Sequence, residues 1–197
     1  MDVKKYIQDS IDTKQLILND CKILENITKI VDVIVEAYKN NKKVLTAGNG
    51  GSAGDAQHIA GELVSKFFFD RPGLSAFSLA TDTSILTAIG NDYGYEKSFS
   101  RQIQANAKDG DVFIAISTSG NSKNLVLALQ EARTKGVTTI GLVGSKNCEM
   151  DEYCDYIIHV PSTSTPTIQE SHIMIGHIIC ALVEETIYTV KGELKWL

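Results

Sequence analysis

The sequence predicts an α/β protein in which a doubly wound, five-stranded parallel sheet is flanked by helices. Five short apolar runs alternate with helical patterns, and this alternation is typical of parallel strands joined by crossover helices. The middle runs are apolar on both faces, as a sheet that is covered on both sides requires. A length of 197 residues suits one domain with an ordinary hydrophobic core.

Residues 1–40 form the first predicted unit and contain no Pro or Gly. Apolar side chains recur at helical spacing there: Ile23, Ile27, Ile30, Ile34 and Ala37. We expect two helices, or one long bent helix, that cover the sheet or pair with another subunit. The sheet-containing core is expected over residues 41–197, and both parts are assigned to a single domain.

The core alternates strands and helices from Lys43 onward. Strand-like runs begin at Lys43, Leu74, Asp111, Val137 and Asp155. Helices are expected over 52–68, 95–107 and 122–135. The last helix should begin near Thr165 as N-cap, with Pro166 at the first helical position, where its missing N–H costs nothing.

The composition excludes several classes of protein. A hydrophobic content of 43% and a charged content of 22% are typical of soluble globular proteins. The net charge of −5 and the scattered lysines argue against a nucleic-acid partner. The longest apolar run, IMIGHIICALV, is too short to span a bilayer, so no membrane partner is expected. The four cysteines form no C-x-x-C pair and are interpreted as reduced thiols of a cytoplasmic protein.

Two loops at the carboxyl ends of predicted strands favour phosphate binding. One contains Asn49, Gly50, Gly51 and Ser52; the other is the segment STSGNS, with hydroxyls on Ser117, Thr118, Ser119 and Ser122. In open parallel sheets ligands bind at this edge, where backbone N–H groups and helix N-termini attract anions. The alternative for each loop is an ordinary strand-to-helix turn with an N-cap.

The first loop also fits the loose dinucleotide fingerprint G-x-G-x-x-A. That fingerprint requires an acidic residue at the end of the second strand. Asp70 has about the right spacing but precedes this strand, and Asp82 comes too late. The dinucleotide interpretation is therefore the weaker one.

Histidine and glutamate residues suggest a catalytic cluster. His58 and Glu62 are four residues apart on a predicted helix and share one face, either as site residues or as a solvated polar pair. His177 interrupts an apolar helix, where a polar ring needs a partner. It lies eight residues after Gln169, on broadly the same half of the helix, whereas His172 is assigned to packing.

Several long motifs, in one order, resemble those of the sugar isomerase (SIS) domain family, and within it the phosphoheptose isomerases. These are GNGGSAGDAQHIAGEL, ATDTS, AIGNDYGYEKSFSRQI, GDVFIAISTSGNSKN and IQESHIMIGHIIC, between residues 42 and 185. The resemblance implies conversion of sedoheptulose 7-phosphate into D-glycero-D-manno-heptose 7-phosphate. This is the first step toward activated heptose for surface polysaccharide, such as lipopolysaccharide or capsule.

The resemblance also implies roles for individual residues. Glu62 and His177 match the catalytic acid–base pair, and His58, Glu62, Gln169 and His177 match a set associated with one zinc ion per subunit. Substrate contacts are implied for Asn49, Gly50, Gly51, Ser52, Glu62, Asn91, Asp92, Ser117, Thr118, Ser119, Ser122 and Gln169. A homotetramer is implied, with active sites at subunit interfaces and the N-terminal helices in its core.

The implied chemistry is an aldose–ketose shift through an enediol, with Glu62 moving the carbon proton and His177 the oxygen proton. A zinc ion would either polarise the carbonyl or hold the site together. The chain departs from the family at Thr167 and Lys66, where Arg is common, and these changes bear on the sugar preference. The alternative function is a non-catalytic SIS protein that senses phosphosugars or binds protein partners.

Overall fold

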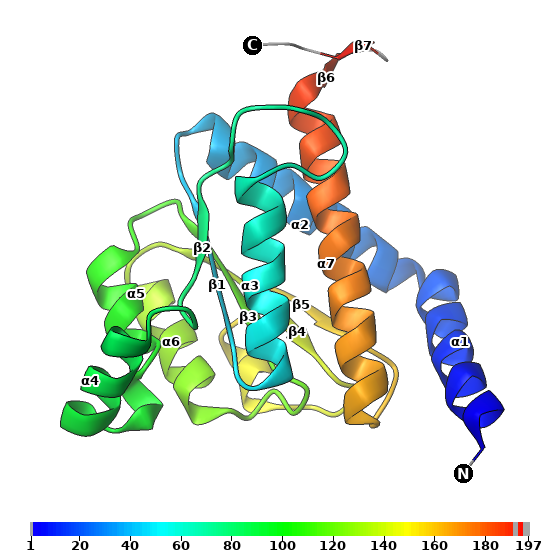
Figure 1. Ribbon diagram of the computed structural model, residues 1–197, viewed down its shortest axis with the longest axis horizontal. Coiled ribbons are helices and arrows are strands. Elements are labelled where there is room, and N and C mark those ends of the chain that lie inside the picture. The colour runs from blue at the N-terminus through cyan, green and yellow to red at the C-terminus, as the bar shows by residue number, and fades with distance from the viewer. Residues whose placement is uncertain (1, 191–192, 195–197) are drawn as a thin grey trace.

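The computed structural model describes residues 2–190 and 193–194, and its centre is a five-stranded, wholly parallel sheet (Figure 1). The strand order is β2-β1-β3-β4-β5. The strands are β1 Val44–Gly48, β2 Ala76–Ser78, β3 Val112–Ile116, β4 Thr138–Val143 and β5 Tyr156–His159. Parallel pairing in this order confirms the predicted fold class.

Helices cover both faces of this sheet. They are α1 Val3–Asn19, α2 Cys21–Lys39, α3 Gly51–Val64, α4 Thr83–Tyr93, α5 Ser100–Asn106, α6 Lys123–Thr134 and α7 Thr165–Tyr188. Short 3₁₀ helices occur at η1 Tyr95–Lys97 and η2 Glu149–Glu152, and a terminal pair of strands at β6 Thr189–Val190 and β7 Glu193–Leu194.

The two faces of β3 pack into two separate cores. Ile114 points into a core built largely with α2, α3 and α7, and Phe113 into one built with α5 and α6. Because neighbouring strand residues point to opposite faces, an unbroken apolar run such as Val112–Ile116 supplies both cores at once.

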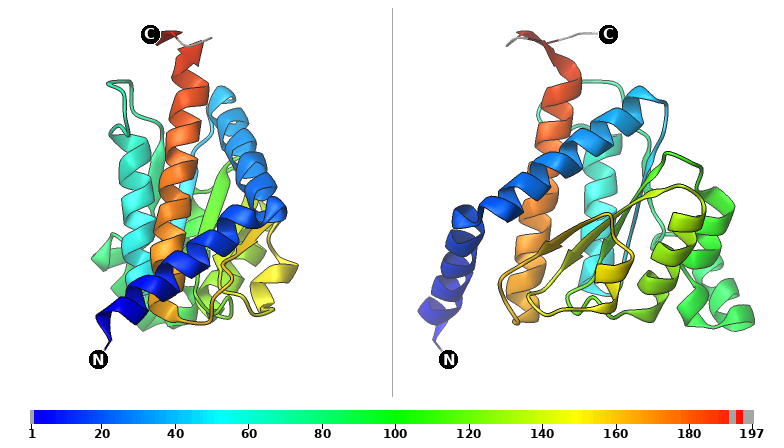
Figure 2. Two further views of the ribbon diagram at one scale, coloured as in Figure 1. Left: turned by 90° about the vertical axis from the view of Figure 1, so that its right-hand side faces the viewer. Right: turned by 180° about the vertical axis from the view of Figure 1, so that it is seen from behind.

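The N-terminal segment forms two helices, as expected. Asp20 separates them and caps α2, its carboxylate accepting hydrogen bonds from the N–H groups of Lys22 and Ile23. Helix α2 packs on the sheet, whereas α1 leans away from the body of the molecule (Figure 2). Tyr6 and Ile7 of α1 are 74% and 57% exposed, so this helix carries apolar surface that the single chain does not cover.

Several boundaries differ from the sequence-based prediction. Helix α3 ends at Val64 rather than at residue 68, because the following loop turns back toward α7. The predicted helix over 95–107 divides into η1 and α5, and α4 was not among the expected helices. Helix α7 begins at Thr165, within one residue of the prediction.

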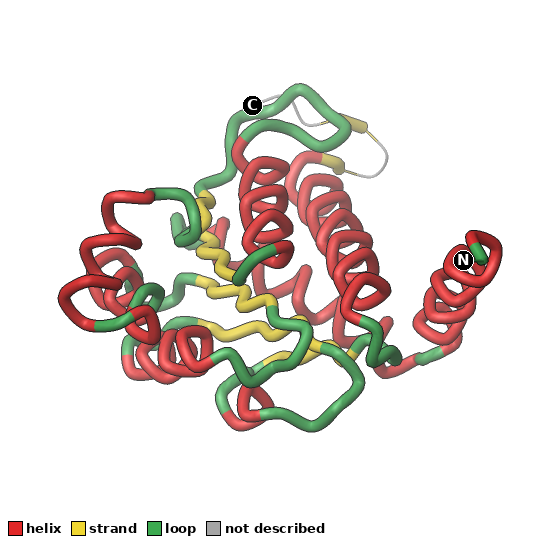
Figure 3. The backbone as a smooth tube through the Cα atoms, turned by 60° about the horizontal axis from the view of Figure 1, so that its bottom comes forward, coloured by secondary structure: helices red, strands yellow, loops and turns green. Residues whose placement is uncertain are grey.

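The carboxyl ends of the strands face one edge of the sheet, which Figure 3 brings forward with its loops. Helices α3, α6 and α7 all begin at this edge, directly after loops that follow β1, β3 and β5. Within the described residues, no helix combines the length and the apolar character needed to cross a membrane.

Candidate active site

The loop after β1 turns sharply into α3. Gly50, the N-cap, has a φ of 57°, in the left-handed region that favours glycine. Ser52 is buried in the first turn of α3, and Gly51 and Gly50 are exposed beside it. The loop therefore presents free backbone at the N-terminus of a 14-residue helix, an arrangement that attracts anions.

His58, Glu62 and His177 form a cluster between α3 and α7. His58 Nε2 lies 3.0 Å from Glu62 Oε1 and 3.3 Å from His177 Nε2. The two imidazole rings meet edge to face with their centroids 4.8 Å apart. The structure thus brings His177 to two predicted site residues that lie more than 110 positions earlier in the chain.

Close packing of α3 and α7 makes this meeting possible. A Cβ atom on Gly176 would lie 2.7 Å from Ile59 Cδ1, so the glycine admits the isoleucine side chain between the helices. Gly176 directly precedes His177, and Ile59 directly follows His58. The buried contact therefore sets the distance between the two imidazoles that flank it.

The cluster fits a metal ion. One ligand atom from each of the three residues lies within 4.8 Å of the other two. Adjacent donors of a tetrahedral zinc site are about 3.3 Å apart, close to the contacts of the two imidazoles and of His58 with Glu62. A single N–H on His58 Nε2 cannot serve both neighbours well, whereas a shared cation serves all three.

Gln169, the fourth residue of the predicted zinc set, lies at the N-terminal end of α7 in this chain. Its amide packs against Gly51, where an added Cβ would lie 2.6 Å from Gln169 Nε2. Eight residues separate it from His177, which corresponds to about 12 Å along a helix. Gln169 is therefore next to the loop after β1, and its role as a zinc ligand stays a prediction.

The Ser/Thr loop after β3 is held by its own hydroxyls. Ser117 Oγ lies 3.1 Å from Ser122 Oγ and accepts a hydrogen bond from the Gly120 N–H at 3.1 Å. Ser119 is exposed, and its hydroxyl accepts from the N–H of Asn121. Ser122 is the N-cap residue of α6, so the loop combines hydroxyls with a helix N-terminus, as predicted.

A cavity of about 270 Å³ adjoins this loop. Thr118 and Ser119 line it from the Ser/Thr loop, Lys146 from the loop after β4, and Ile168 from the first turn of α7. The histidine–glutamate cluster does not line it. The start of α7 lies between the two regions, since Ile168 borders the cavity and Gln169 contacts Gly51.

Asn124 links the two loops, and nothing in the sequence marks it as a linking residue beyond its place in the first turn of a predicted helix. Its side-chain amide exchanges two hydrogen bonds of 2.9 Å with that of Asn49. Asn49 Oδ1 also accepts from the Tyr95 hydroxyl at 2.7 Å. The Asn49 side chain, predicted to bind substrate, is thus occupied with holding the loops together, while its backbone remains at the helix entrance.

Asn91 and Asp92 lie on α4, on the other face of the sheet from α3 and α7. Both are exposed, and the Asn91 amide donates to Asp92 Oδ1 at 2.9 Å. Asp82, the acid considered for a ribose contact, caps α4 by accepting from the Ile85 N–H at 2.9 Å. That carboxylate already has a structural function.

Two further titratable groups lie on the helices that carry the cluster, His172 on α7 and Asp55 on α3. His172 is fully buried, and burial lowers its pKa to about 4, although a hydrogen bond to the Val143 carbonyl opposes this. It is a neutral packing residue, as expected. Asp55 precedes His58 by one turn, and one of its oxygens is buried without a partner among the described residues. Burial raises the pKa of Asp55, and the charge of His58 opposes the rise.

Comparison with known proteins gives consistent matches. The family model "SIS domain" matches residues 6–144. A phosphoheptose isomerase from Aneurinibacillus thermoaerophilus is 59% identical, with 96% of each chain covered. A phosphoheptose isomerase structure from Neisseria gonorrhoeae superposes with a TM-score of 0.86 at 38% identity, covering 93% of this chain and 97% of the other. A phosphoheptose isomerase structure from Francisella tularensis superposes with a TM-score of 0.89 at 32% identity, covering 93% of this chain and 96% of the other.

Proposed function

The chain belongs to the phosphoheptose isomerases of the SIS domain family, and from this premise we propose how it isomerises sedoheptulose 7-phosphate. The product is D-glycero-D-manno-heptose 7-phosphate. The observation that carries the site assignment is the convergence of Glu62 and His177, through His58, on one point between α3 and α7.

The substrate spans from the sheet edge to this cluster. Its phosphate binds at the helix N-termini, with Ser52 from the first loop and Ser117, Thr118, Ser119 and Ser122 from the second. Gln169 and the Asn49–Gly51 backbone contact the sugar. The distance of about 12 Å along α7 between Gln169 and His177 is comparable to an extended seven-carbon sugar phosphate.

Glu62 is the carbon acid–base group. Its Oε1 contacts His58, and the structure records no hydrogen bond to Oε2 within the described residues, so Oε2 is free for the substrate. Oε2 removes a proton from C1, and the C–H electron pair forms the C1–C2 double bond of the enediol. The carboxylic acid then returns the proton to C2.

His177 handles the oxygen protons. It gives a proton to the C2 oxygen as the enediol forms, and takes one from the C1 hydroxyl as the aldehyde forms. The two transfers balance, so the enzyme returns to its starting state after each turnover.

A zinc ion suits the donors of this cluster, with His58, Glu62 and His177 as its protein ligands and Gln169 added from the family pattern. When bound, it supplies Lewis-acid polarisation of the sugar oxygens. Since a metal-bound imidazole nitrogen cannot donate a proton, His177 would then use its other ring nitrogen.

The assembly is proposed to be a homotetramer. Support comes from the uncovered apolar surface of α1, where Tyr6 and Ile7 lie on a helix that leans out from the body. Asn91 and Asp92 of α4 would then bind substrate at a subunit interface. The reaction is placed in the cytoplasm, consistent with four free cysteines. The product enters heptose synthesis for lipopolysaccharide or capsule.

The decisive experiment follows the reaction in deuterium oxide by NMR. Sedoheptulose 7-phosphate is expected to give a heptose phosphate that carries deuterium at C2. Tight binding of the substrate without turnover would instead favour a phosphosugar-sensing SIS protein. Preferential turnover of another ketose phosphate would indicate that Thr167 and Lys66, where the family commonly has Arg, alter the sugar preference.

A further inference from the structure

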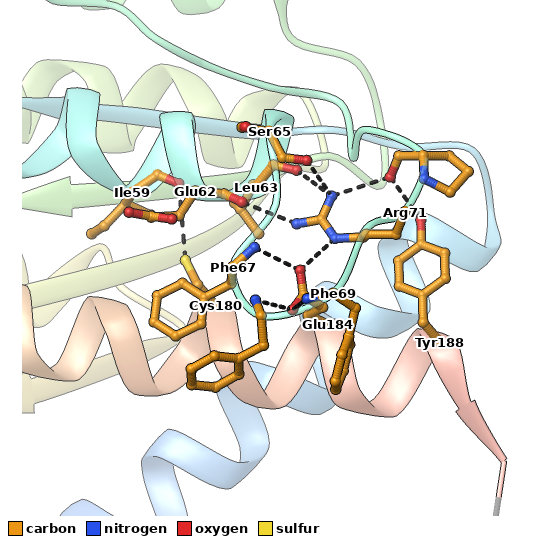
Figure 4. A network of polar contacts seen from close by, with 12 residues as sticks. Ile59, Glu62, Leu63, Ser65, Phe67, Phe69, Arg71, Cys180, Glu184 and Tyr188 are labelled. Atoms are coloured by element: carbon orange, nitrogen blue, oxygen red, sulfur yellow. Dashed lines mark hydrogen bonds and ion pairs between the residues drawn. The ribbon is translucent and has the colours of Figure 1, made fainter. Parts of the chain in front are cut away.

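A buried ion pair joins the loop after α3 to α7, outside the reacting groups. Arg71 Nε donates to Glu184 Oε2 at 2.7 Å, and the two side chains are 2% and 0% exposed. Figure 4 shows this pair at the centre of a network that includes Glu62 and Phe67. Glu184 lies seven residues after His177, so both side chains share one face of α7.

Arg71 caps the turn of α3 that carries Glu62. Its guanidinium donates to the carbonyl of Glu62 at 3.0 Å and to that of Leu63 at 2.8 Å. It also contacts the carbonyls of Ser65 and Pro72. The last carbonyls of a helix lack intrahelical partners and form the negative end of its dipole, so a planar cation with several donors fits there.

Glu184 fixes the loop from the other side. Its carboxylate accepts hydrogen bonds from three consecutive backbone N–H groups, those of Phe67, Phe68 and Phe69. Burial alone would raise the pKa of Glu184, but these N–H groups and Arg71 lower it overall. These three hydrogen bonds hold the loop so that the Phe67 ring centroid lies 5.7 Å from that of the His177 ring.

We infer that Arg71 and Glu184 are positioning residues of the isomerase site, an inference that rests on the proposed function. The pair holds the Glu62 turn through hydrogen bonds to backbone carbonyls. It also positions the Phe67 ring, which packs beside the His177 imidazole. The ion pair by itself is weak evidence for a stabilising role, because apolar residues of similar volume commonly replace such a pair without loss; what these two residues add is a set of contacts with the backbone of the Glu62 turn and the following loop. A planar, five-donor guanidinium instead defines one geometry.

The chain offers a matched control pair, next to the starts of β1 and β3. Lys43 and Asp111 form an ion pair with side chains 18% and 2% exposed. Asp111 also accepts from the backbone N–H groups of Lys43 and Lys108, much as Glu184 does from its loop. These residues lie at the starts of β1 and β3, away from the helix face that carries Glu62.

The test compares kcat and KM for sedoheptulose 7-phosphate in Arg71→Met, Arg71→Lys and Glu184→Gln against Lys43→Met and Asp111→Asn. All are assayed well below the lowest melting temperature, with folding checked by circular dichroism. We expect kcat to fall roughly 10- to 100-fold in the first three, with little change in KM, because the reacting groups shift while the phosphate stays bound. The control variants should lose thermal stability but keep kcat.

The double variant Arg71→Met/Glu184→Leu separates geometry from stability. It should recover only the part of the melting temperature that Arg71→Met loses to an unpaired Glu184 charge, because the loop N–H groups still lack an acceptor, and it should still show the low kcat. A folded double variant with the kcat of the natural protein would overturn the inference, as would an equal loss of kcat in the control pair.

Imidazole resonances of His58 and His177 provide a readout that needs no turnover. They should shift in Arg71→Met and stay in place in Lys43→Met; unchanged resonances in both would overturn the inference. A natural protein that does not isomerise the substrate contradicts the proposed function instead, and the resonances still decide whether the pair positions the cluster.

Discussion

His58 and His177 contact one another through their Nε2 atoms at 3.3 Å, although 119 positions separate them in the chain. Each lies next to a residue of the tight Ile59–Gly176 contact, so helix packing and site geometry depend on the same few atoms. Glu62 joins the pair through His58. This relationship makes the site sensitive both to its chemical groups and to the spacing of two helices.

Replacing Glu62 with Gln removes the proposed carbon base while keeping its size. We expect kcat to fall roughly 10²- to 10⁴-fold, the range that general acid–base catalysis contributes. Loss of deuterium incorporation at C2 measures the same step. Glu185→Gln, an exposed change on α7, should retain full activity. Full turnover by the Glu62 variant would remove the shuttle role.

His58→Ala and His177→Ala should each weaken zinc binding. Loss of an outer partner of a metal ligand already lowers affinity roughly 10- to 100-fold, so loss of a ligand should cost at least that much. Zinc content after dialysis, measured by elemental analysis, tests this. His159→Ala is the control, because that imidazole contacts Asp151 and the Gly144 carbonyl instead. Equal zinc content in all variants would argue against the cluster as the metal site.

Gly176→Ala introduces a methyl group where Ile59 already packs, with contacts of 2.7 and 2.8 Å. Relieving them requires α3 and α7 to move or Ile59 to change rotamer, so we expect a loss of about 1–3 kcal/mol in unfolding free energy and a lower kcat. Gly61→Ala on α3 meets no atom within 4 Å and should stabilise the helix by up to about 1 kcal/mol. Urea unfolding and kcat distinguish the two; identical behaviour would show that the helix spacing is not set here.

Asn124→Ala should loosen the two substrate loops. It leaves the Asn49 amide without its two reciprocal hydrogen bonds, at a cost of about 1–3 kcal/mol in unfolding free energy. Because these loops are proposed to bind the phosphate, KM should rise more than kcat falls. Asn106→Ala breaks a single hydrogen bond to the Gln102 carbonyl and serves as control. An unchanged KM for the Asn124 variant would show that the link does not shape the phosphate site.

His172 should make the fold less stable in mild acid. Its pKa is about 4 when folded, against 6.5 for an exposed histidine, so only the unfolded chain takes up this proton between these values. The contribution of the neutral ring is therefore complete above pH 6.5 and is lost as pH falls toward 4. Between pH 7 and 5 this amounts to ~2 kcal/mol.

His172→Gln keeps a side-chain donor for the Val143 carbonyl and cannot titrate. Urea unfolding at pH 7 and pH 5 should show a smaller decline for this variant than for the natural protein. The same decline in both would mean that other groups carry the acid sensitivity.

Much of the fold followed from periodicity, because strands that are buried on both faces must be apolar at every position, as in Val112–Ile116. Helix α4 was missed because its sequence, TSILTAIGNDY, mixes polar and small residues and buries only Ile89 fully. Its start depends on the Asp82 cap, a single contact that periodicity does not report.

The meeting of His58, Glu62 and His177 was predictable because their chemistry and the motifs agreed, and their catalytic roles stay predictions. Arg71 and Glu184 were not, because an arginine in a loop and a glutamate within a Glu-Glu pair are both typical of solvated surface. Only the fold shows that these two residues, 113 positions apart in the chain, meet in a buried network. Long-range partners of this kind leave no local signal in a single sequence.

The position of α7 in the chain has a consequence for biosynthesis. Its docking surface on α2 and α3 is translated long before α7 itself leaves the ribosome, so the nascent polypeptide exposes an apolar groove that includes Ile30 and Ile59. Catalytic competence therefore waits until α7, which carries His177, has docked on this surface.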